Sequence, residues 1–201
     1  MGSRDRDTKS LHDKLKVFFK KGATAPLAAA NELVVGAELA RDLGPESPLH
    51  RRLRAIKEVG EKVLHIRVQD GGVEKIWSCI RDLLEEPNSE GRHAALGLLR
   101  CIAEGQTDLL IMRTILFQYL QRTHSTHPPE DYQLRFKLLY ALTNTGKDIK
   151  CFEELIGPFL LEWLPQLQAA PHIVEFVNLI INIVKFNAAY LDEDIVHGIV
   201  K

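Results

Sequence analysis

The sequence predicts an all-α protein, an α-solenoid of HEAT- or armadillo-like helix pairs with about nine to ten helices. Apolar residues such as Val73, Ile76 and Ile80 recur at i, i+3 and i+7, the period of a helix with one buried face rather than of a strand. Expected helix starts lie about 20 residues apart, so that pairs recur about every 40 residues, as HEAT and armadillo units do. A compact helical bundle is the alternative, but many short helices without a long crossover favour stacking.

The N-terminal elements begin with a tail, residues 1–9, that we expect to be disordered. Helices are then expected over Ser10–Lys20 and over about 31–43. The next has Ser47 as its N-cap and Pro48 at its first position, where the missing N–H costs nothing. From position 31 onward, we expect helices to start near Asn31, Ser47, Gly72, Ser89, Asp108, Pro129, Asp148, Pro171 and Asp192.

Three local signals punctuate the second half of the chain. Gly105 is expected to end a helix in the left-handed conformation, and the segment HPPED, 127–131, is expected to form a turn. Asp192 is expected to be an N-cap, with Glu193 and Asp194 at the positive end of the helix dipole. That last helix has room for about two turns only, so the solenoid segment 10–201 is expected to be incomplete at its C-terminus.

Composition favours a soluble protein without nucleic-acid or membrane partners. The formal net charge is −1, from 26 basic and 27 acidic residues, whereas a nucleic-acid binder usually carries a basic excess. The three cysteines are widely spaced and lie in apolar segments, which is typical of reduced, buried thiols in a cytosolic or nuclear protein. The longest apolar run, 173–184, is shorter than the roughly 20 residues that span a bilayer, so we expect no integral membrane insertion.

Signs of catalysis or of a bound cofactor are weak in this sequence. It contains no glycine-rich phosphate loop, no Gly-x-Ser-x-Gly elbow and no Cys-x-x-Cys pair. His124 and His127 have a metal-like spacing, but we interpret them as an exposed polar turn because a closed zinc site needs four ligands. Glu193 and His197 lie at i and i+4 without a third ligand at a matching spacing. We therefore expect a non-catalytic chain with no cofactor and no metal.

Two polar groups are candidates for partner contacts. The first is the cluster Arg51, Arg52 and Arg54, which could meet acidic positions of another protein. The second is Asn178, Asn182 and Lys185, which share one helix face with Glu175. For both groups the alternative is an ordinary solvated surface.

Three segments carry a resemblance to a known family. GRHAALGLLRCIAEGQ (91–106), FKLLYALTNTGKDI (136–149) and VKFNAAYLDEDI (184–195) resemble the N-terminal region of tuberin, the large subunit of the tuberous sclerosis complex. The likeness runs in order from about Ser10 to the end of the chain. It implies the beginning of a HEAT-type solenoid that engages the coiled coil of hamartin.

The resemblance also implies a setting for this segment. Tuberin is a GTPase-activating protein toward Rheb and restrains TOR signalling, through a C-terminal domain that these 201 residues do not contain. No catalytic residue is carried over, and the segment is expected to be a cytoplasmic scaffold, peripheral to endomembranes through its partners. The alternative function is a generic HEAT-repeat adaptor in transport or trafficking.

Overall fold

A computed structural model describes residues 32–167 and 173–200 of the chain. The expected tail 1–9 and helix Ser10–Lys20 lie outside the described residues. Among those described there are nine α-helices and no strand longer than an isolated parallel bridge between Leu33 and Val68. The helices are α2 (Ala37–Leu43), α3 (Leu49–Val63), α4 (Gly72–Ile80), α5 (Ser89–Gly105), α6 (Leu110–Arg122), α7 (Tyr132–Leu142), α8 (Glu153–Leu167), α9 (Ile173–Asn187) and α10 (Glu193–Val200). The all-α prediction is confirmed.

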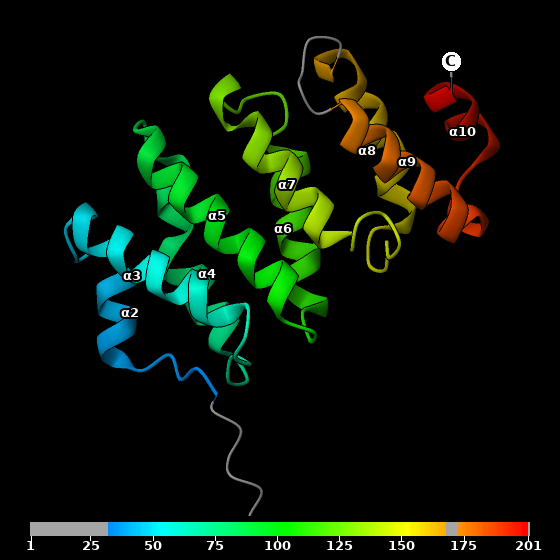
Figure 1. The fold of residues 1–201 in the computed structure, drawn as a ribbon. Helices are drawn as coiled ribbons and strands as arrows, with labels where there is room; N and C mark the ends of the chain where they lie inside the picture. The colour runs from blue at the N-terminus through cyan, green and yellow to red at the C-terminus, as the bar shows by residue number, and fades with distance from the viewer. Residues whose placement is uncertain (1–31, 168–172, 201) are drawn as a thin grey trace, which may run out of the picture. The chain divides into compact units, whose positions relative to one another are not determined.

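The helices from α3 onward form two layers. In the first layer α3 packs on α5 and α5 on α7 (Figure 1), and the ring of Phe136 in α7 lies 5.9 Å from that of Phe176 in α9. In the second layer, Trp77 of α4 contacts Tyr119 of α6, Phe117 of α6 contacts Phe159 of α8, and α8 packs on α10. First-layer helices start about every 40 residues, the period of a HEAT-type solenoid.

The core is one continuous apolar cluster between the layers. It runs from Val35 to Ile183, and its largest fully buried side chains include Trp163, Phe117 and Phe159. The short helix α2 packs on α3 and α4 and covers the first pair. Each pair therefore buries its apolar face against its neighbours, as expected for a solenoid.

Several helix ends differ from the predicted ones. Ser47 does not cap α3, since its hydroxyl donates to the carbonyl of Arg41 and closes α2, while Pro48 itself stands at the N-cap. The N-cap of α5 is Asn88, whose side chain accepts from Glu90 N. The helix expected to start near Asp108, α6, begins at Leu110, and no side chain caps it.

Two further predictions concern helix ends: the one for Gly105 is wrong and the one for Asp192 is correct. Gly105 is the last residue of α5, and a Cβ there would lie 2.1 Å from the carbonyl oxygen of Val63. A glycine is needed for close packing of α5 on α3, not for a left-handed cap. Asp192 accepts from Asp194 N just before α10, which agrees with its predicted capping role.

Candidate interaction surface

Three buried arginines tie first-layer helices to neighbouring elements of the stack. Arg52, Arg92 and Arg135 are each the fourth residue of their helices, α3, α5 and α7, and each is nearly inaccessible to solvent. A buried charge requires partners, because desolvation of an unpaired ion is costly. These side chains therefore hold the stack together and are not available to another protein.

Arg52 makes a bidentate ion pair that links three elements. Its guanidinium donates to both carboxylate oxygens of Asp82, at 2.8 and 2.7 Å, and to the carbonyls of Leu43 and Cys79. The hydrogen bonds from Arg52 hold the pKa of Asp82 below its usual range. Arg52 therefore joins the end of α2 and the end of α4 to α3.

Arg92 performs the same task one repeat later. It donates to both oxygens of Asp131, at 2.8 and 3.2 Å, and to Glu130 and the carbonyls of Glu86 and Pro87. The bond to Asp131 raises the pKa of Arg92, so the guanidinium stays charged although it is buried. His93 Nε2 lies 2.9 Å from the same carboxylate.

The predicted arginine cluster separates on the helix. Arg51 is about half exposed and pairs with Asp42 at 3.1 Å, and Arg54 is exposed, whereas Arg52 is buried. Consecutive residues of a helix point about 100° apart, so Arg52 falls on the face of Ile56 and Val59. Only Arg51 and Arg54 are left as candidate partner contacts.

The predicted polar group on α9 also separates into a member that is hydrogen-bonded within the chain and members that are exposed. Asn182 donates to the carbonyl of Thr145 at 2.8 Å, so it is engaged within the chain. Asn178 and Lys185 are exposed, and the ammonium of Lys185 lies 5.4 Å from the ring centre of Phe186. Asn187, which no feature of the sequence pattern indicated, is buried and donates to the carbonyl of Gly146.

Asn182 and Asn187 hold the loop between α7 and α8. Asn144, Thr145 and Gly146 have φ values of 45°, 59° and 87°, a run of left-handed conformations that only Gly adopts without strain. Bonds from α9 to the carbonyls of Thr145 and Gly146 hold this conformation. Asn182 and Asn187 thus have a structural role that resembles that of the buried arginines.

The outer face of α9 is apolar and exposed. Val174, Val177 and Ile181 are 66%, 45% and 53% exposed, and they surround Asn178 and Lys185 on the helix. By length and composition alone, the stretch Ile173–Tyr190 is the one candidate membrane span among the described residues, and 22% of it is buried in the protein. On its buried side, Phe176 packs on Phe136 of α7.

The histidines of the α6–α7 turn are not an exposed polar pair, contrary to prediction. His124 is 6% exposed and its ring lies 5.1 Å from that of Trp163. Burial lowers the pKa of both His124 and His127. In the described part of the chain no three His, Cys, Asp or Glu side chains are grouped so that they could hold a metal, and Glu193 and His197 are both exposed.

Comparisons with known proteins agree with this architecture. A family model described as a domain of unknown function (DUF3384) matches residues 49–201. A solved structure described as "Structure of the TSC2 N-terminus" is similar with a TM-score of 0.67 and 22% identity, over 82% of this chain. The present chain spans 43% of that solved chain. The two-layer helical solenoid therefore belongs to the DUF3384 family of tuberin N-terminal regions.

Proposed function

We propose that this chain is a protein-binding scaffold segment of a tuberin-like GTPase-activating subunit. It engages the coiled coil of hamartin and contributes to negative regulation of TOR signalling through Rheb. The observation that carries the proposal is membership of the tuberin N-terminal family, supported by the solenoid fold. The segment itself catalyses no reaction in this proposal, and activation of the GTPase belongs to another part of the tuberin polypeptide.

The distribution of polar groups supports a binding role. The buried arginines, Asn182 and Asn187 are hydrogen-bonded within the chain, whereas Arg51, Arg54, Asn178 and Lys185 remain on the surface. Stacked helix pairs give an extended surface of the kind that repeat proteins use to bind partners. We propose the cytoplasm as its location, with attachment to endomembranes through partners and with no nucleic-acid partner and no membrane insertion of its own.

Co-precipitation of the 201-residue chain with a purified hamartin coiled-coil fragment tests the proposal. The unmodified chain is expected to bind. The double variant Arg51→Glu, Arg54→Glu and the double variant Asn178→Asp, Lys185→Glu are each compared with it, since reversing a rim charge weakens steering and changes the salt dependence. Lys75→Glu on α4, also exposed, is the matched control and is expected to bind like the unmodified chain.

Two outcomes would contradict the proposal. No binding by the unmodified chain would remove the coiled-coil assignment. Full-length tuberin from which the segment corresponding to residues 1–201 has been deleted is a second comparison. Undiminished hamartin binding by that deletion variant would show that the segment has no direct role.

A further inference from the structure

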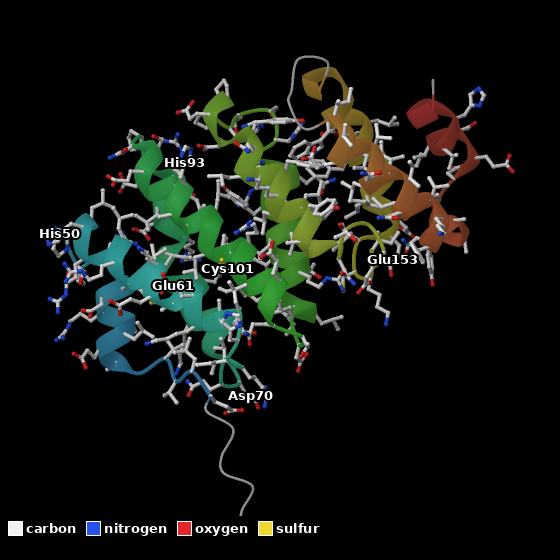
Figure 2. The ribbon with its side chains drawn as sticks, in the orientation of Figure 1. His50, Glu61, Asp70, His93, Cys101 and Glu153 are labelled. Atoms are coloured by element: carbon white, nitrogen blue, oxygen red, sulfur yellow. The ribbon has the colours of Figure 1, made fainter. Side chains whose placement is uncertain are left out.

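A shallow apolar groove runs along the surface between α3 and α5. It encloses about 440 Å³ and is lined mostly by apolar side chains, among them Leu53, Leu64 and Leu98. Figure 2 shows Glu61, Cys101 and His93 along these two helices. Leu64 is 37% exposed, so part of this apolar surface is open to solvent. None of the predicted contact residues lines the groove.

Two glycines make the groove deep enough for another backbone to approach. A Cβ added at Gly97 would meet no atom within 4 Å, so the space above it is open. A Cβ added at Gly60 would meet only Leu98 and Cys101, at 3.8 and 3.9 Å. The distance between packed helices depends on the side chains at their contact, and small residues allow the closest approach.

The length and periodicity of the groove match one helix. On the side of α3 the groove is lined by Leu53, Gly60 and, just after the helix ends, Leu64; Leu53 and Leu64 lie 11 positions apart, or about 16 Å, roughly three helical turns. An amphipathic helix presents apolar residues at i, i+3 or i+4, i+7 and i+11, and the last of these lies about 16 Å from the first. An occupant of this length would fill the groove with about four apolar side chains.

The charges at the rim restrict the chemistry of the occupant. On α3 the rim carries Lys57 and Glu61, and on α5 it carries Glu90 and Arg100. A lipid surface or a nucleic acid would require a basic rim. Mixed signs on both sides instead complement the Glu and Lys residues that flank the apolar seam of a coiled-coil helix. Arg54, one turn before Lys57, extends this rim.

We propose that the α3–α5 groove is the docking site for one helix of a coiled-coil partner. The apolar ridge of that helix lies over Gly60 and Gly97, and its flanking charges lie opposite Glu61 and Arg100. This inference rests on the proposed function and names the surface that performs it. It assigns the main contact to the first two repeats rather than to the exposed face of α9.

Filling the groove with a side chain tests the site. Gly97→Leu places a side chain in open space, and Leu is a better helix former than Gly, so the fold and thermal stability should be retained. Binding of the purified hamartin coiled-coil fragment, measured by titration calorimetry, is expected to weaken at least about tenfold because the ridge can no longer seat. Glu58→Leu, exposed on α3 outside the groove, is the matched control and should bind normally.

The outcomes separate the groove from the proposed function. If the unmodified chain binds and Gly97→Leu binds equally well, the groove is not the site, although coiled-coil binding stands. If the unmodified chain does not bind, both proposals fail. If the chain alone forms dimers that Gly97→Leu abolishes, the occupant is a second copy and the assignment to a coiled coil is overturned.

Cys101 provides an independent readout, because it lines the groove. The bound fragment is expected to slow alkylation of Cys101, followed by peptide mass spectrometry. Cys151, in the distant α7–α8 loop, serves as the internal reference and should react at an unchanged rate. Equal alkylation of Cys101 with and without saturating fragment would overturn the proposal.

Discussion

Arg92 and Arg135 occupy the same position in successive first-layer helices, yet their surroundings differ. Arg92 forms a buried ion pair with Asp131 and further bonds to Glu130 and two carbonyls. Arg135 donates to the carbonyl of Leu120 at 2.7 Å and lies 5.5 Å from the ring centre of Tyr119, with no ion pair among the described residues. Burial accordingly lowers the pKa of Arg135.

The cause of this difference can be read in the chain. Asp131 directly precedes α7, and in the next repeat the residues before α9, 168–172, include no Asp or Glu. At the fourth position of α9 the arginine is replaced by Phe176, which packs on Phe136, and Phe136 also packs on Trp163. The stack therefore changes from ionic ties in its first repeats to aromatic packing in its last ones.

The largest expected effect comes from breaking the ionic tie. Arg92→Met leaves Asp131, only 5% exposed, without its main partner. Loss of one member of a buried pair costs about 3–5 kcal/mol of unfolding free energy. Urea denaturation should show this loss, whereas Arg54→Met at an exposed position should stay within about 0.5 kcal/mol. A small effect of Arg92→Met would mean that the buried ion pair between Arg92 and Asp131 contributes little to stability.

The aromatic half of the molecule should show a smaller effect, which depends on pH. The pKa values of His124 and His127 are lowered by burial, and the positive charge of Arg135 acts in the same direction. Below the unfolded pKa of about 6.5, the unfolded state binds more protons than the folded one. The unfolding free energy should therefore fall as the pH decreases from about 6.5.

Urea unfolding at several pH values between 5 and 8 measures this dependence. His124→Phe removes one titrating group while keeping an aromatic ring against Trp163, so its profile should be flatter than that of the unmodified chain. Parallel profiles for the two proteins would exclude His124 as the source.

The sequence predicted the helices and their period well, because both depend on local apolar spacing. The burial of Arg52, but not of Arg51 and Arg54, could also be predicted from the sequence. Arg52 lies four residues before Ile56 and seven before Val59, so it shares their helix face. The burial of His124 could not be predicted in this way, because the ring is covered by Trp163 from α8. The same holds for Asn182 and Asn187, whose acceptors are in a loop about 40 residues away.

The smallest effect is expected at Arg135, and its direction sharpens the comparison. Arg135→Met removes a charge that has no ion-pair partner in the described structure, so relief of its desolvation offsets the lost bond to Leu120 and the contact with Tyr119. The unfolding free energy should change by no more than about 1 kcal/mol, in either direction. A loss as large as that of Arg92→Met would show that position in the repeat, rather than the presence of an acid, determines how much a buried arginine contributes.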